Sequence, residues 1–149
     1  MNDFQHKGPK QTRDIDKMQL EWRRHLMVWL GDLKQQFHQI NVHKDDHQYL
    51  YFFWRPFGSK QKPIMAKIRV LQFGFRCAPF VASYILSECV KLAKEKAETE
   101  EVRNFCDTFM NKVYCDDLMF GGQTVPELLR LKELSEFICN QGSFEITKF

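Results

Sequence analysis

The stretch NKVYCDDLMFGG, residues 111–122, restricts what this chain can fold into more than any other part of the sequence. Apolar runs typical of β-strands flank two adjacent carboxylates, Asp116 and Asp117. Two like charges repel each other, and neither is stable in a core without a partner. The pair is therefore either an exposed turn, where Asp is common, or part of a site that binds something positive.

A third carboxylate follows the same pattern. Asp32 ends the apolar run MVWLGDL, which predicts a buried strand over residues 27–33. If this strand and the carboxylate-bearing strands are neighbours in one sheet, the three carboxylates meet at one edge. Such a cluster is stable near neutral pH when divalent cations lie between its oxygens. Hard oxygen ligands favour Mg²⁺, or Mn²⁺ in its place, and a pair of such ions serves phosphoryl transfer.

A second candidate metal site is HKDDH, in which His43 and His47 are four residues apart with Asp45 and Asp46 between them. On a helix, that spacing could hold a metal ion. No third ligand is near and the stretch is uniformly polar, so a solvated turn or short helix is the favoured interpretation.

Cysteine usage and composition limit the remaining classes. The five cysteines include no CxxC pair, which indicates free thiols in a reducing compartment and neither a disulfide framework nor a zinc site. The net charge of +3 permits an anionic partner without arguing for nucleic acid. No apolar run approaches the roughly 18 residues of a membrane span, and no apolar signal core begins the chain. We expect an intracellular protein, cytoplasmic or nuclear, that is not secreted and has no membrane partner.

Alternating helices and strands are expected over one domain, residues 11–149, after a flexible arm of residues 1–10. Residues 49–55 and 65–73 predict a hairpin, residues 94–104 a solvated helix end and loop, and residues 143–149 a final strand. Helices are expected from about Thr12, from Pro79, and from the capping box at residues 124–127 up to Gly142. Their expected apolar faces are Ile15, Met18, Trp22 and Leu26; Val81, Ile85, Cys89 and Leu92; and Leu128, Leu131, Leu134 and Ile138.

Four stretches resemble, in this order, the palm motifs of reverse transcriptases: WLGDLKQQFHQINV, LQFGFRCAPF, KVYCDDLMFGG and GSFEITKF. They are similar to motif A with Asp32, motif B with Gly74 and Pro79, motif C with the YxDD box of residues 114–117, and motif D with Lys148. Residues 8–40 and the Phe73–Gly74 pair look most like the Bel/Pao class of LTR retrotransposons. The resemblance covers residues 8–149.

The resemblance implies an α+β fold, a reverse-transcriptase palm built on a ferredoxin-like βαββαβ antiparallel sheet with helices on one face, plus a partial fingers hairpin. It implies an RNA-directed DNA polymerase that uses two Mg²⁺ ions, with Mn²⁺ as a substitute. A primer 3′-hydroxyl would attack the α-phosphorus of a deoxynucleoside triphosphate. The implied partners are an RNA or DNA template-primer and deoxynucleoside triphosphates.

The resemblance also implies roles for the residues of the metal and primer sites. Asp32 and Asp116 would ligate the ions, Asp117 would complete the acidic cluster, and Leu33 would offer its backbone carbonyl to one ion. Lys148 would donate a proton to pyrophosphate. Near the primer end, the resemblance places Tyr114 and Cys115.

At the nucleotide, the resemblance assigns four residues. Phe37 would lie beneath the sugar and exclude a 2′-hydroxyl; a core aromatic is the alternative. Gly74 would let the nucleotide or template approach closely; an ordinary turn glycine is the alternative. Gln72 and Phe73 would face the same site.

The sequence also departs from the family pattern. Lys34, Gln35 and Gln36 stand where Bel/Pao elements more often carry an acidic residue followed by Lys-Met, although none of these positions ligates metal. Thumb, RNase H and integrase regions are absent from the sequence, so we expect a fragment that self-association or a partner chain supplying the thumb would complete. The alternatives are a transposon-derived nucleic-acid-binding or assembly module, or a remnant, with catalysis lost.

Overall fold

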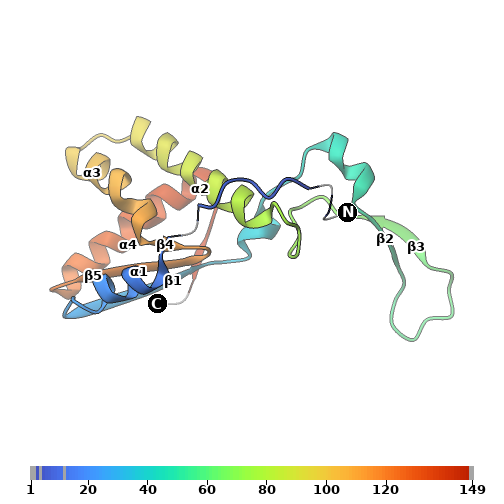
Figure 1. The fold of residues 1–149 in the computed structure, drawn as a ribbon, viewed down its shortest axis with the longest axis horizontal. Helices are drawn as coiled ribbons and strands as arrows, with labels where there is room; N and C mark the ends of the chain where they lie inside the picture. Colours follow the sequence, from blue (N-terminus) through green and yellow to red (C-terminus); the bar gives the residue numbers. More distant parts are fainter. Residues whose placement is uncertain (1–2, 4, 12, 148–149) are drawn as a thin grey trace.

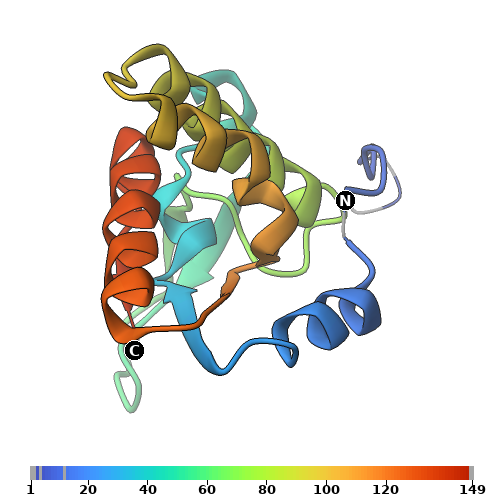
Figure 2. The same ribbon diagram turned by 90° about the vertical axis from the view of Figure 1, so that its left-hand side faces the viewer.

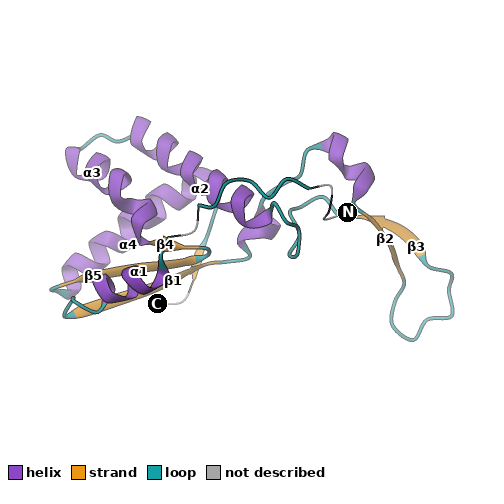
Figure 3. Cartoon of the chain, viewed as in Figure 1, coloured by secondary structure: helices purple, strands orange, loops and turns teal. Residues whose placement is uncertain are grey.

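A computed structural model describes residues 3, 5–11 and 13–147 of the chain. Figures 1 and 3 show a body of helices packed on a sheet, from which a two-stranded hairpin projects. The helices are α1 (Ile15–Trp22), α2 (Ala78–Glu95), α3 (Glu100–Phe109) and α4 (Val125–Cys139). The strands are β1 (Met27–Leu33), β2 (Tyr51–Trp54), β3 (Ile64–Lys67), β4 (Val113–Tyr114), β5 (Asp117–Gly122) and β6 (Ile146–Thr147). Short 3₁₀ helices are η2 (Gln36–Gln39), η3 (Lys44–Tyr49), η4 (Met110–Lys112) and η5 (Asn140–Gly142).

The main sheet has four antiparallel strands in the order β4-β5-β1-β6, so β1 is central and pairs with β5 on one side and β6 on the other. Along the chain, α2 and α3 lie between β1 and β4, and α4 lies between β5 and β6. The elements of the body thus follow the βαββαβ order. The predicted α+β class with a small antiparallel sheet is confirmed, and the predicted hairpin is present as the separate β2-β3 sheet.

The sequence predicts a buried strand over residues 27–33, but only one face of β1 is buried. Trp29 and Leu33 face the core, whereas Val28 and Leu30 are exposed. The reason is that α2, α3 and α4 cover only one face of the sheet, so successive side chains alternate between core and surface. Within the core, Trp29 stacks on Phe120 of β5 with ring centroids 5.2 Å apart.

The first helix, α1, lies against the opposite face of β5, so the expectation of helices on one face holds only for the other three. Trp22 donates its indole N–H to the carbonyl of Phe120 at 2.7 Å. A Cβ on Gly121 would meet the ring of His25, which follows α1 in the chain. Figure 2 shows α1 on one side of the strands and α3 and α4 on the other.

The limits of α1 differ from the expected ones. Its N-cap is Asp14, whose carboxylate accepts the amide N–H groups of Asp16 and Lys17. The expected start at Thr12 lies outside the described residues. The helix ends at Trp22 because the chain turns there into β1, which leaves Leu26 outside the helix and 78% exposed.

The buried face of α2 is rotated from the predicted one. It consists of small and medium side chains: Ala78, Ala82, Leu86, Cys89 and Ala93. Of the predicted face only Cys89 is fully buried, Val81 and Ile85 are partly buried, and Leu92 is exposed. Alanines occupy the contact line because they let neighbouring elements come close.

The helix α3 was not expected at all, since residues 94–104 were assigned to a helix end and loop. The Thr99 hydroxyl caps the helix by accepting the amide N–H of Val102. Glu100 and Glu101 lie in its first turn, where negative charge is favourable. Its buried face is Phe105, Cys106 and Phe109. The charge run is therefore the start of a helix whose apolar face completes the core.

The helix α4 begins and packs as predicted. The Thr124 hydroxyl accepts the amide N–H of Glu127, whose carboxylate in turn accepts the amide N–H of Gln123. Leu134 and Ile138 are buried, and Leu128 and Leu131 are partly buried against the core. The helix ends at Cys139, and Gly142 ends the 3₁₀ turn after it.

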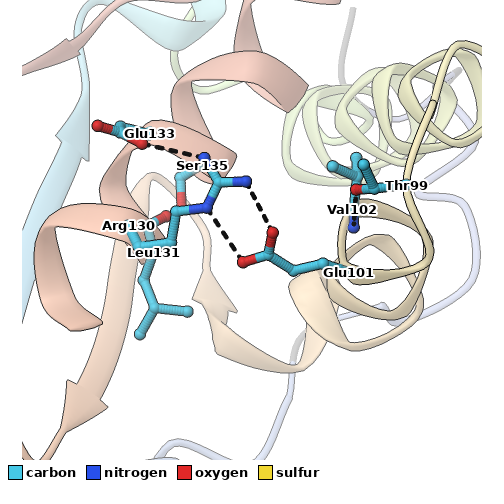
Figure 4. Close-up of polar contacts among 7 residues, drawn as sticks. All are labelled: Thr99, Glu101, Val102, Arg130, Leu131, Glu133 and Ser135. Carbon is cyan, nitrogen blue, oxygen red and sulfur yellow. Dashed lines mark hydrogen bonds and ion pairs between the residues drawn. The ribbon is translucent and has the colours of Figure 1, made fainter. Parts of the chain in front are cut away.

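An ion pair ties α4 to α3. Figure 4 shows the guanidinium of Arg130 donating to both carboxylate oxygens of Glu101, at 3.0 and 2.7 Å, and to Glu133 at 3.1 Å. The planar fork of arginine matches a carboxylate in this way. The contact therefore holds two helices in a fixed relation on the solvent side.

The described part of the N-terminal arm contacts the body. Gln5 accepts the amide N–H of Arg76 at 3.0 Å, and a Cβ on Gly8 would lie 2.3 Å from the ring of Phe80. Only glycine fits at that position. Among the described residues, no helix is both long and apolar enough to cross a bilayer.

Candidate active site

One row of residues crosses all four strands of the main sheet. Tyr114 of β4 pairs with Asp117 of β5, Asp117 pairs with Asp32 of β1, and Asp32 pairs with Thr147 of β6. Residues directly opposite each other in antiparallel strands point to the same face. Because Leu33 next to Asp32 is buried in the core, the row lies on the sheet face opposite α2, α3 and α4, called the open face below although α1 packs on part of it.

The remaining predicted carboxylate, Asp116, lies in the two-residue turn between β4 and β5. Its carbonyl accepts the amide N–H of Leu33 at 2.9 Å, which fixes the turn against the end of β1. Asp32, Asp116 and Asp117 are all half-buried. The register therefore brings Asp32 and Asp117 to the same face, with Asp116 in the adjoining turn, and the neighbouring-strand condition set by the sequence is met.

The turn itself is strained at Cys115, which has a positive φ of 55°. A non-glycine residue is uncommon in this left-handed region and carries a cost of order 1 kcal/mol or more. Cys115 is exposed, but desolvation by the atoms around it raises the pKa of its thiol, and the negative charges of Asp116 and Asp117 raise it further. The thiol is thus protonated at neutral pH and unsuited to be a nucleophile.

Thr147 is a contact of the site that sequence reasoning missed. Its hydroxyl lies 3.3 Å from the carbonyl oxygen and 3.4 Å from the Oδ2 carboxylate oxygen of Asp32, and it donates toward either one. It thereby restrains the Asp32 side chain from the β6 side. Beside it, Lys34 forms an ion pair with Glu145 at 2.6 Å, which also joins the end of β1 to β6. The predicted proton donor Lys148 lies outside the described residues.

The donor chemistry of this end of the sheet suits a hard cation. Three aspartates supply oxygen ligands, the kind that Mg²⁺ prefers. Among the described residues, however, no three or more His, Cys, Asp or Glu side chains are grouped so that they could hold a metal ion. The register places Asp32 opposite Asp117, and the carboxylates would have to turn toward one another to close around an ion.

The HKDDH stretch forms η3, as the favoured interpretation predicted, and does not gather its side chains around a centre. The His43 ring contacts the carboxylate of Asp45 at 3.5 Å, whereas His47 is joined through Nε2 to the carbonyl of Val42 at 3.0 Å. The two histidines thus have separate partners.

The predicted nucleotide-binding residues Phe37 and Phe73 lie together. Their ring centroids are 4.7 Å apart in an edge-to-face contact, with Phe37 half-buried against the core and Phe73 exposed. Phe37 therefore packs as a core aromatic and also borders the surface where Phe73 lies.

Gly74 occupies the third position of a tight turn over residues 72–75, closed by the bond from the Phe75 amide to the Gln72 carbonyl. Its φ of +87° is close to the value that the third residue of a type II turn adopts, and glycine reaches it at no steric cost. A Cβ there would meet nothing within 4 Å. The side chain of Gln72 reaches the carbonyl of Val70 at 3.5 Å.

Gln36, in the first turn after β1, is the unexpected buried residue of this region. It is only 3% exposed, and its side-chain amide nitrogen has no hydrogen-bond partner among the described residues. Such burial is costly for an amide. The sequence carried no signal for it beyond the departure from the family pattern noted above.

Comparison with known proteins does not assign the chain to a family. The chain matches no protein-family model, and no curated protein is similar to it at a significant level.

Proposed function

We propose that this chain is the palm, with part of the fingers, of an RNA-directed DNA polymerase of the Bel/Pao retrotransposon type. Asp32, Asp116 and Asp117 would carry its metal site. The proposal includes Mg²⁺, with Mn²⁺ as a substitute, and a template-primer and deoxynucleoside triphosphates as ligands.

The observation that carries this proposal is the register of β1 with β5. It places Asp32 directly opposite Asp117, while the Leu33 amide binds the Asp116 carbonyl. Motifs that lie far apart in the sequence thus meet at one point of the fold. The βαββαβ order of the body and the β4-β5 hairpin with the YxDD box at its turn also support it.

The roles follow from where the side chains lie. Asp32 and Asp116 would turn toward each other and hold the ions, with Thr147 restraining Asp32. Two divalent ions bound there would supply activation of the primer hydroxyl and stabilisation of the leaving pyrophosphate. Phe37, backed by Phe73, would limit the space at the sugar. Tyr114, on the same face as the carboxylates, would support the primer end.

A second candidate function is a nucleic-acid-binding or assembly module in which catalysis has been lost. It is favoured by the absence, among the residues that the structure describes, of three carboxylates already grouped for a metal. In this case the row on the open face would be a relic of descent, and binding would not depend on divalent ions.

Primer extension on an RNA template with Mg²⁺ or Mn²⁺ separates the two functions. The wild type is compared with Asp116→Asn and with Asp45→Asn, an exposed aspartate remote from the row in sequence. Extension by the wild type and Asp45→Asn, but not by Asp116→Asn, is expected. Equal extension by Asp116→Asn contradicts the proposed site. No extension by any of the three proteins fits the binding module, and it fits equally a palm that needs a partner chain to supply the thumb.

A further inference from the structure

A basic pocket lies at the base of the hairpin, apart from the row of carboxylates. It has a volume of about 480 Å³ and is lined by Asn41, Val42, Lys44, His47, Lys67 and Arg69. Three of these six residues are cations, one is a histidine, and none is acidic. A concave surface with only positive charge attracts anions and raises their local concentration.

Backbone hydrogen bonds fix the walls of this basic pocket. The Val42 amide donates to the Arg69 carbonyl at 2.9 Å, and the Ile68 amide donates to the Leu50 carbonyl at 2.9 Å. His47 is joined to the Val42 carbonyl, and the Lys67 ammonium lies 5.9 Å from the centre of the Tyr51 ring. The charges are thus held on a framework and do not depend on a mobile loop.

The charge of the chain is concentrated in this region. No Asp or Glu occurs between Asp46 and Glu88, whereas residues 51–69 alone contain five Lys and Arg. Because the whole chain has a net charge of +3, the rest of it is net negative. Asp45 and Asp46 precede His47 on η3 but do not line the pocket.

The hairpin beside the pocket presents aromatic and apolar side chains to solvent. In the β2-β3 register, Tyr51 lies opposite Lys67 and Phe53 lies opposite Met65, so these four side chains share one face. Phe53 is 78% exposed and Met65 is 65% exposed. Phe52 and Trp54 point to the other face.

We propose that the basic pocket binds a backbone phosphate of single-stranded nucleic acid, whose neighbouring base stacks on Phe53. Cations that track a backbone next to exposed aromatic rings form the usual surface for unpaired strands, since every base has a face that can stack. This inference does not depend on the polymerase proposal, because it uses neither the carboxylates nor a metal ion.

The test measures binding of a fluorescent single-stranded oligonucleotide to the full chain by anisotropy, without divalent ions or nucleotides. In the double variant Lys67→Gln/Arg69→Gln, we expect about a tenfold loss of affinity. We also expect the slope of log affinity against log salt to fall by about 0.7, because the pocket holds one phosphate and about 0.7 of a counterion is released per neutralised phosphate of a single strand. Lys17→Gln on α1, which removes an exposed lysine of the body, should leave both quantities unchanged.

Phe53→Ala tests the stacking. It should weaken binding about fivefold or more without changing the salt slope, whereas Trp54→Ala on the opposite face should have little effect. Circular dichroism and thermal melting establish that each variant is folded. The binding assay contains neither divalent ions nor nucleotides, so a failed polymerase assay and a failed binding assay remain distinguishable.

Three outcomes would overturn the proposal. The first is an affinity of the folded Lys67→Gln/Arg69→Gln protein within twofold of the wild type. The second is inorganic phosphate competing as well as the oligonucleotide at equal phosphate concentration, which would indicate a site for a small anion. The third is a preference for vesicles of anionic phospholipid over the oligonucleotide, which would indicate a membrane surface.

Discussion

Replacing Gln36 with methionine should stabilise the protein. The side chain is 3% exposed and its amide nitrogen has no partner among the described residues, so folding removes that donor from water without compensation. An unsatisfied buried donor costs about 1–3 kcal/mol. Methionine has a similar length and volume, so it fills the same space with little repacking. We expect a net gain of about 1.5 kcal/mol in the free energy of unfolding.

The gain is measurable by two methods. For a chain of this length, about 1.5 kcal/mol raises the melting temperature by about 3–6 °C. In urea the midpoint should rise with an unchanged slope, because the surface exposed on unfolding does not change. Gln36→Glu should shift both quantities in the opposite direction, because a carboxylate would then be buried in place of the amide.

A matched control is Gln61→Met in the hairpin loop. Gln61 is exposed, and the hydrogen bond recorded there is made by its backbone amide and not by its side chain. Its substitution should leave stability nearly unchanged. A Gln36→Met protein that melts at or below the wild-type temperature would refute the reasoning, since it would mean that the amide gains more in the fold than its geometry indicates.

Three further predictions concern charge and thiols. The Arg130 guanidinium lowers the pKa of Glu101, so the ion pair should stabilise the fold fully above the ordinary carboxyl range and lose this effect as the pH falls through the lowered pKa. The difference in melting temperature between the wild type and Glu101→Gln should shrink over the same fall in pH. Alkylation of the native protein followed by mass spectrometry should modify the exposed Cys115 long before Cys139, whose pKa burial raises to about 12, and equal rates at the two thiols would contradict the fold. Mg²⁺ should speed the Cys115 reaction in the wild type and not in Asp116→Asn, because a bound cation offsets the negative charge beside the thiol; identical rates with and without Mg²⁺ would argue against a metal at that carboxylate.

Local patterns made much of the fold predictable. The strand over residues 27–33, the hairpin and the cap of α4 all follow from signals within a few residues, such as the Thr124 hydroxyl and the Glu127 carboxylate. A turn between the two apolar runs was also expected, but at the carboxylates Asp116 and Asp117; it lies one residue earlier, at Cys115 and Asp116, and Asp117 begins β5.

The predictions that were wrong depend on contacts between residues that are distant in the sequence, which a short stretch of sequence does not reveal. Residues 94–104 have the pattern of a solvated chain because they are mostly charged. The large apolar residues of α3, Phe105 and Phe109, come only after the first turn of the helix. The buried face of α2 depends on which side chains allow close packing, and alanine carries little hydrophobic signal of its own. The half-burial of β1 depends on which sheet face the helices cover, and a strand cannot specify that by itself.

The candidate site also contains residues that the sequence predicts and residues that it does not. The three aspartates were predictable as neighbours once two strands were assumed to be adjacent, and the register meets that condition. Thr147 was not predictable, because its contact with Asp32 depends on the pairing of β6 with β1, which the short final strand does not signal. The burial of Gln36 likewise depends on how the chain leaves β1.

The central position of β1 has a consequence for the order of folding. Both of its partners are distant along the chain, and Asp32 and Thr147 are 115 residues apart. Closing a loop of that length costs about 4 kcal/mol of chain entropy beyond a constant, whereas the β2-β3 hairpin closes a loop of only nine residues, 55–63. Local elements such as the hairpin and α2 should therefore appear early, and the row of carboxylates should assemble only when β1 is enclosed on both sides. Asp32 is thereby kept apart from Asp116 and Asp117 in the unfolded chain and should join them only in the last, cooperative step.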